Sequence, residues 1–222
     1  MAAEDQAWRA FIEGEVYPDA QAPWRDDPAY AIILDYPGLR DSIGGHVAPA
    51  LQQAIGLVKA MTQVDVLDRL RANRPAHGLC LGFGANALEP YDVLTVFGLD
   101  RVHGYEWIGA QVIEAARFLH LREDARLADK IRLHHATVSD LSALTDRSIR
   151  VVYTANMFNR EIPMSADTFE RALHELLRVL VPSGFVFSRG SAGVLEQRLG
   201  QSCRTLLDTP LVSVFERGEP GA

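Results

Sequence analysis

Two glycines and one acid are the residues of this chain whose types and spacing point most directly to ligand chemistry. Gly82 and Gly84 follow the apolar residues 79–81 and precede a predicted helix over residues 87–97. Glycine lets the backbone come close to a ligand, and the N-terminal amides of that helix would face it. Glu106 follows the next apolar run, where its carboxylate can accept hydrogen bonds from both hydroxyls of a ribose. The spacing therefore predicts a site for a ligand that contains a ribose.

The glycine pattern alone does not specify that ligand. Gly82-x-Gly84-x-x-Ala87 fits the dinucleotide fingerprint, and Glu106 lies near the spacing of about 20 residues expected for its ribose-binding acid. This interpretation predicts an NAD(P)-dependent oxidoreductase. A tight turn between a strand and a helix, with no ligand at all, is the structural alternative.

The elements that would position these residues alternate along the chain from about residue 75. Residues 108–119 and 169–180 carry apolar side chains at helical spacing, whereas residues 151–153 and 185–187 are short, continuously apolar runs. Such alternation predicts a parallel sheet with helices on both faces. The last two apolar runs, 203–207 and 211–215, are too close together for a crossover helix, so we predict an antiparallel pair.

Residues 1–74 have a different texture, because prolines interrupt their helical patterning. Residues 41–70 are predicted to be long and largely helical. One face of this helix would carry Ile43, Val47, Leu51, Ile55, Val58 and Met61. We interpret residues 1–74 as an N-terminal helical cap that forms a lid over a substrate. The aromatic residues proposed for this lid are Tyr17, Trp24, Tyr30 and Tyr36.

Composition favours a single large α/β core rather than two domains. The chain has 222 residues, of which 48% are hydrophobic, and a formal net charge of −7. An acidic chain without a basic stripe disfavours nucleic acid as the partner and favours a small molecule, and a homodimer is the assembly left open. Cys80 and Cys203 lie in predicted strands, so we expect reduced core thiols and no metal site. Residues 1–10 do not resemble a signal peptide and no apolar run spans a membrane, so we expect a cytoplasmic protein.

From about residue 76 to about residue 190, the chain resembles a class I S-adenosylmethionine-dependent methyltransferase, segment by segment. Residues 80–86 (Cys-Leu-Gly-Phe-Gly-Ala-Asn) correspond to that family's first motif, and residues 102–112 to its second strand, ribose-binding acid and following helix. Residues 135–141 occupy the place of the adenine loop, and residues 149–159 resemble the fourth strand and active-site loop. Residues 172–187, with Pro182-Ser183-Gly184, resemble the last helix, its Pro-x-Gly turn and the fifth strand.

The resemblance implies a doubly wound, mostly parallel seven-stranded α/β sheet with a C-terminal antiparallel hairpin, formed by a Rossmann-like domain over residues 75–222. It also implies S-adenosylmethionine as cofactor and no metal. The cofactor-binding positions implied are Gly82, Phe83, Gly84, Asn86, Glu106, Trp107, Thr137, Val138 and Asn156. The catalytic candidates are Asn156, Asn159 and His135. Asn86 could instead cap the helix, and Asp140 could cap a turn.

Two positions depart from the family's pattern. Cys80 stands where the first strand usually carries an acid, and Arg150 precedes the fourth strand where Asp is frequent. The first change removes a negative group that would help to hold the ammonium end of the cofactor. The expected function is methyl transfer to a small-molecule O, N or C atom, mainly by positioning and exclusion of water. A fold-retaining binding or scaffold protein and, with less support, the NAD(P)-dependent oxidoreductase are the alternatives.

Overall fold

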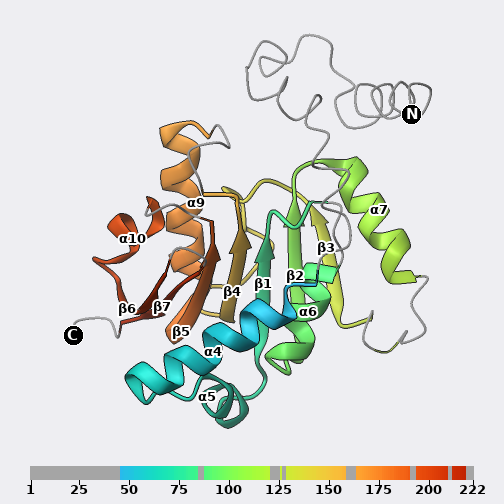
Figure 1. The fold of residues 1–222 in the computed structure, drawn as a ribbon. Helices are drawn as coiled ribbons and strands as arrows, with labels where there is room; N and C mark the ends of the chain where they lie inside the picture. The colour runs from blue at the N-terminus through green and yellow to red at the C-terminus, as the bar shows by residue number, and fades with distance from the viewer. Residues whose placement is uncertain are drawn as a thin grey trace.

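The computed structural model describes residues 46–84, 88–120, 126, 129–158, 164–190, 194–209 and 212–218. Seven strands form one sheet in the order β3-β2-β1-β4-β5-β7-β6 (Figure 1). All neighbouring pairs are parallel except those made by β7, which runs antiparallel to both β5 and β6. The strands are β1 His77–Leu81, β2 Arg101–Glu106, β3 Ile131–His135, β4 Ile149–Ala155, β5 Leu180–Arg189, β6 Cys203–Asp208 and β7 Ser213–Arg217. This arrangement confirms the predicted sheet and its terminal antiparallel hairpin.

Helices cover both faces of the sheet, as the apolar strands require. The described helices are α4 Ala48–Thr62, α5 Val66–Ala72, α6 Leu88–Val96, α7 Gly109–His120, α9 Ala166–Val179 and α10 Val194–Leu199. One buried cluster joins α4, α6 and α7 to the sheet face that carries Cys80 and Tyr153. A second cluster joins α9 and α10 to the opposite face, which carries Leu79 and Val152. The doubly wound prediction is therefore confirmed.

The helical segment predicted over residues 41–70 is divided into two helices. α4 ends where Gln63 adopts a left-handed conformation, and α5 begins after Asp65, whose side chain accepts a hydrogen bond from the Asp68 amide. The Met61 side chain is 67% exposed, so its predicted place on the buried stripe was wrong. Val47, Leu51, Ile55 and Val58 are buried as expected.

A residue from another helix caps the start of α4. Val47 occupies the N-cap position without a side-chain cap, and the Asp92 carboxylate of α6 accepts from the amides of Val47 and Ala48 at 2.6 and 2.9 Å. His46 also contacts Asp92, at 3.0 Å through Nδ1. This tertiary cap fixes α4 against α6 on the face of the sheet that both helices cover.

Residues 46–72 thus pack into the same core as the sheet. The proposed lid residues Tyr17, Trp24, Tyr30 and Tyr36, and Ile43 of the predicted stripe, lie outside the described residues. The lid therefore stays a prediction. Within the described part of the chain, none of the helices has the length and apolar character needed to cross a membrane.

Candidate functional site

The loop after β1 turns sharply at its two glycines. Gly82 has φ +67° and Gly84 has φ +59°, both in the left-handed region that other residues rarely adopt. A Cβ atom at Gly82 would stand 2.8 Å from the Met157 sulfur, so the loop after β4 lies directly against this turn. The Gly82 amide donates to the Tyr105 carbonyl at 2.9 Å, which joins the turn to the end of β2. The ends of β1, β2 and β4 therefore meet here.

Glu106 is buried at the end of β2 and contacts the glycine loop directly. Its Oε2 accepts from the Gly84 amide and its Oε1 from the Ile108 amide, both at 3.0 Å. Burial raises the pKa of this carboxyl, and the amides that donate to it act in the opposite direction. The backbone amide of Trp107 also donates a hydrogen bond to this carboxyl. A carboxylate has about four acceptor sites, so Glu106 keeps capacity for a ligand hydroxyl. The structure therefore brings Gly84 and Glu106 together, as their spacing indicated.

Among the predicted cofactor residues, Phe83 and Val138 have buried side chains, whereas the Trp107 side chain is partly exposed. The Phe83 side chain is buried against β2, where a Cβ on Gly104 would lie 3.0 Å from its ring, so its backbone is the part left for a ligand. The Val138 side chain is likewise buried in the core. The Trp107 side chain is 42% exposed, and its carbonyl contacts the His135 ring at 2.9 Å.

The loop after β3 is held by its own turns. The Thr137 hydroxyl contacts the Ser139 hydroxyl at 3.0 Å, and the Asp140 carboxylate accepts from the Ser142 amide at 3.1 Å. Hydrogen bonding to Ser142 lowers the pKa of Asp140. Of the two roles considered for Asp140, the structure thus shows the turn cap.

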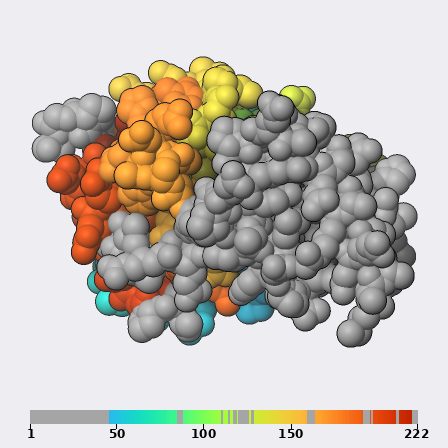
Figure 2. Space-filling view, turned by 90° about the horizontal axis from the view of Figure 1, so that it is seen from above, coloured from blue at the N-terminus to red at the C-terminus, as the bar shows by residue number. Residues whose placement is uncertain are grey.

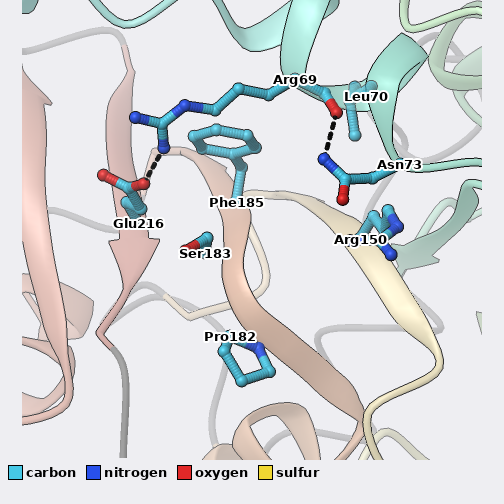
Figure 3. A pocket seen from close by; sticks show the side chains of 8 residues that line it. All are labelled: Arg69, Leu70, Asn73, Arg150, Pro182, Ser183, Phe185 and Glu216. Carbon is cyan, nitrogen blue, oxygen red and sulfur yellow. Dashed lines mark hydrogen bonds and ion pairs between the residues drawn. The ribbon is translucent and has the colours of Figure 1, made fainter.

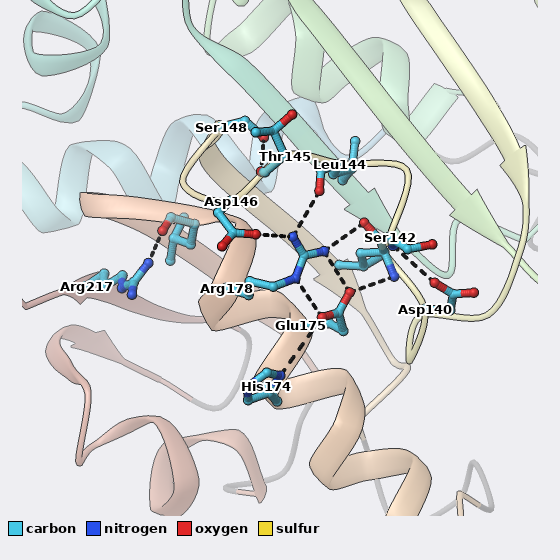
Figure 4. A network of polar contacts seen from close by, with 12 residues as sticks. Asp140, Ser142, Leu144, Thr145, Asp146, Ser148, His174, Glu175, Arg178 and Arg217 are labelled. Carbon is cyan, nitrogen blue, oxygen red and sulfur yellow. Dashed lines mark hydrogen bonds and ion pairs between the residues drawn. The ribbon is translucent and has the colours of Figure 1, made fainter.

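Arg178 ties this loop to α9 (Figure 4). Its guanidinium donates to the carbonyls of Leu141 and Leu144 at 2.9 and 3.0 Å and pairs with Glu175 and Asp146. Glu175 in turn accepts from the Leu141 amide, and its pKa is lowered chiefly by Arg178. Figure 2 shows α9 (orange) lying beside the segment after β3 (yellow). The hydrogen bonds of Arg178 therefore hold the backbone of this loop in one position for a ligand.

The loop after β4 presents Asn156. This residue has φ +55°, and its amide donates to the Arg189 carbonyl at 2.8 Å. A Cβ on Gly190 would lie 2.2 Å from the Asn156 side-chain oxygen, so the absence of a side chain there makes room for Asn156. Asn159 and Asn86 lie outside the described residues.

The two described catalytic candidates are not neighbours. His135 ends β3 and Asn156 follows β4, and β2 and β1 stand between these strands. Adjacent strands are about 4.8 Å apart, so three spacings separate the two positions by roughly 14 Å. Asn156 and His135 therefore do not form one catalytic group. His135 lies beside Trp107 and the ribose-binding candidate Glu106.

Comparison with solved structures identifies the architecture that carries these loops. An rRNA methylase from Streptococcus thermophilus matches over 76% of this chain and 96% of its own, with a TM-score of 0.52 and 12% identity. A SAM-dependent methyltransferase from Aquifex aeolicus matches over 77% of this chain and 97% of its own, with a TM-score of 0.50 and 13% identity. The chain has the class I methyltransferase fold.

Other comparisons are more limited. A proposed sarcosine dimethylglycine methyltransferase from Galdieria sulphuraria matches at 21% identity and a TM-score of 0.45, over 68% of this chain and 53% of its own. The chain therefore spans about half the length of that protein. The sequence of the chain described here matches no family model and no curated protein.

Sequence reasoning missed one polar cluster at the carboxyl edge of this methyltransferase fold. Glu89, in the first turn of α6, has a buried Oε2 with no hydrogen-bond partner among the described residues, and the same holds for the Tyr153 hydroxyl of β4. A signal was present, since Glu89 precedes the apolar Val93 and Phe97 by four and eight residues. That spacing places an acid on the buried stripe of the helix.

The carboxyl edge fits S-adenosylmethionine, the cofactor that the fold implies. Glu106 keeps acceptor capacity for ribose hydroxyls, and Gly84 allows close approach of the backbone. The unpartnered Glu89 and Tyr153 atoms add capacity for a polar ligand group. Within the described ranges, no cluster of three or more His, Cys, Asp or Glu residues could hold a metal ion.

A hollow of about 470 Å³ lies at the opposite edge of the sheet, where β4 and β5 begin (Figure 3). Its lining residues are Arg69, Leu70, Asn73, Arg150, Pro182, Ser183, Phe185 and Glu216. The Arg69 guanidinium donates to Glu216, which also pairs with Arg204 at 2.6 Å. None of the residues predicted to bind the cofactor lines this hollow, so its size does not mark the candidate site.

Proposed function

We propose that this chain is an S-adenosylmethionine-dependent methyltransferase that acts on a small molecule. The observation that carries the proposal is the contact between Glu106 and the Gly84 amide, which fixes a buried carboxylate beside the glycine turn. A carboxylate at the end of the second strand of such a sheet suits the hydroxyls of a ribose. The fold supports this proposal, because ligands of open α/β sheets bind outside the carboxyl ends of the strands.

Each strand end would contact a different part of the cofactor. Glu106 would accept the ribose hydroxyls, while the backbone of Thr137 and Val138, in the loop fixed by Arg178, would border the adenine. When bound, S-adenosylmethionine supplies a methyl group that is already activated on a sulfonium. The chain's own contribution would be to hold and orient the reactants and to exclude water.

Asn156 is the described residue best placed to position the acceptor. It stands at the end of β4, where its backbone amide is fixed by the Arg189 carbonyl and its side-chain oxygen packs over Gly190. Its side-chain amide could donate to or accept from an acceptor molecule held there. His135 lies at the end of β3, next to Glu106 at the end of β2. This position favours a role near the adenosine over a role as a base at the acceptor.

The net charge of −7 supports a small molecule as the acceptor rather than RNA. The rRNA methylase among the similar structures shares the fold at 12% identity, which is no argument for its substrate. We keep the proposed lid over residues 1–74 and the cytoplasmic location as parts of this proposal.

Cys80 favours a second candidate function, a binding protein that retains the fold. The thiol is fully buried, and burial raises its pKa well above the usual range, so it supplies no negative charge. A protein of this kind would bind the cofactor without transferring its methyl group.

A thermal-shift panel tests the proposal. The ligands are S-adenosylmethionine, S-adenosylhomocysteine, NAD and NADP, each added to the full chain at increasing concentration. We expect the melting temperature to rise with the first two ligands, because a ligand that binds the native state stabilises it. Stabilisation by NAD or NADP alone would favour the oxidoreductase instead, and no shift with any ligand would contradict cofactor binding.

A further inference from the structure

Glu89 is a partly buried acid, and one of its oxygens has no hydrogen-bond partner among the described residues. It lies in the first turn of α6, directly after the glycine loop in the chain. Its Oε2 is shielded from solvent and meets no donor among the described residues. A buried polar atom left unpaired costs about 1–3 kcal/mol, so such atoms in a folded protein need an explanation.

The Glu89 carboxyl interacts electrostatically with residues from four strands. Glu89 is the strongest charged neighbour of both Cys80 on β1 and Tyr153 on β4. Arg189 at the end of β5 and Glu106 at the end of β2 act on Glu89 itself, together with Asp92 of the same helix. The carboxyl therefore lies at the carboxyl edge of the sheet, near the ends of β1, β2, β4 and β5.

A second buried atom at the same place also lacks a partner. Cys80 and Tyr153 are paired across β1 and β4 and share the sheet face that α6 covers. The Tyr153 hydroxyl, like Glu89 Oε2, is shielded without a hydrogen bond of standard geometry in the described part of the chain, and Arg189 lies close enough to lower its pKa. Two unmet polar atoms beside one glycine turn indicate a ligand group that hydrogen-bonds to both.

The chemistry of the cluster indicates the sign of that group. The Cys80 thiol is buried and uncharged, so Glu89 is the member that can present a negative charge. The acidic group is thus Glu89 of helix α6, while strand β1 carries the neutral Cys80. A ligand cation with N–H donors satisfies both the carboxylate and the phenol oxygen.

We propose that Glu89 binds the α-ammonium group at the amino-acid end of the cofactor, with the Tyr153 hydroxyl as a second acceptor. The inference rests on the proposed function, because it assigns a role toward the same cofactor. It makes α6, and not β1, the source of the negative charge at this end of the site.

Binding of an ammonium group at Glu89 would be linked to proton release. Burial, with Glu106 and Asp92 in addition, raises the pKa of Glu89 to about 8 against the opposing effect of Arg189. At pH 7 the carboxyl of the free protein would therefore be about nine-tenths protonated, and it must ionise to pair with the ammonium. Affinity should rise close to tenfold from pH 6 to pH 7.

Calorimetric titration of the full chain with two ligands tests this assignment. The ligands are S-adenosylhomocysteine and its deamino analogue, which lacks the ammonium group alone. We expect Glu89→Gln to weaken binding of S-adenosylhomocysteine about 10- to 100-fold and to leave binding of the analogue within about 3-fold, as for loss of one charged hydrogen bond. Titration in two buffers of different ionisation enthalpy should show release of about 0.9 proton by the wild type and none by the variant.

Asp92→Asn is the matched control, because Asp92 is a second acid on α6 but is bound to His46 and the start of α4. It should keep a preference for S-adenosylhomocysteine over the analogue at least as large as in the wild type, because Glu89 is retained and loss of the Asp92 charge lowers the pKa of Glu89. An unchanged affinity of Glu89→Gln for S-adenosylhomocysteine, or an equal loss for both ligands, would overturn the role of Glu89. Failure of the wild type to bind either ligand would instead overturn the proposed function.

Discussion

The two edges of the sheet differ in how their acidic groups are paired. At the amino edge, the hollow of about 470 Å³ carries the Glu216 carboxylate, which pairs with both Arg69 and Arg204. At the carboxyl edge, Glu106 keeps unused acceptor capacity, and Glu89 Oε2 has no partner in the described structure. The carboxylate of the hollow is therefore paired within the protein, whereas Glu89 Oε2 at the carboxyl edge is not paired in the described part of the chain.

We infer from this difference that unmet hydrogen-bonding capacity, rather than the volume of a hollow, points to the proposed site. A folded chain rarely leaves a buried polar atom unpaired, so such atoms at a site indicate what the ligand must supply. The predictions that follow test whether ligand binding depends on the carboxyl edge alone.

The largest effect is expected at Gly84. Gly84→Val should abolish S-adenosylhomocysteine binding, because a branched side chain disfavours φ +59° and blocks the approach of the ligand to the backbone. Circular dichroism should show a retained fold. Calorimetric titration measures the affinity.

Gly98→Val is the matched control for this substitution. Gly98 has φ +60° in the turn before β2, at the amino edge. The same strain should cost about 1–2 kcal/mol of stability there while leaving the affinity unchanged. Equal loss of binding in both variants would mean that strain, and not the site, explains the result at Gly84.

A smaller effect concerns the pH dependence of stability at Glu89. The pKa of this carboxyl rises from 4.5 to about 8 on folding, so the folded protein holds a proton that the unfolded chain releases across this window. The free energy of unfolding contributed by Glu89 is therefore fully present below pH 4.5 and lost as pH rises toward 8, a loss on the order of a few kcal/mol. Glu89→Gln should remove this dependence, and urea unfolding at pH 5, 6, 7 and 8 measures it. Parallel curves for the two proteins would show that Glu89 ionises normally.

The fold was predictable from the sequence because its signals are local and repeated. Short apolar runs gave the strands, and the brief connection before Ser213 required an antiparallel pair. The nearness of Glu106 to the glycine loop was also predictable, since adjacent parallel strands end at the same edge, but the hydrogen bond to the Gly84 amide was not predicted. Spacing along the chain carries this information directly.

Features that depend on packing between distant segments were harder to predict. The cap of α4 by Asp92 joins residues 45 positions apart, and nothing near Val47 signals it. His135 could not be placed relative to Asn156 before the strand order was known. Glu89 was missed because a helical acid is usually solvated, and its burial depends on what α6 packs against.

The smallest effect on binding is expected at the amino edge. Glu216→Gln should lower stability by about 1–2 kcal/mol, because two guanidinium groups lose a charged acceptor. S-adenosylhomocysteine affinity should stay within about twofold of the wild type. A large loss of affinity in this variant would remove the distinction between the two edges.

Calorimetric titration of S-adenosylhomocysteine into the wild type and Glu106→Ala tests the central claim most directly. The Glu106 side chain accepts from the Gly84 amide of the glycine turn, and we assign it to the ribose hydroxyls. The account predicts that Glu106→Ala weakens binding by about 1–3 kcal/mol with the fold intact. Unchanged affinity in a folded Glu106→Ala variant would contradict the account.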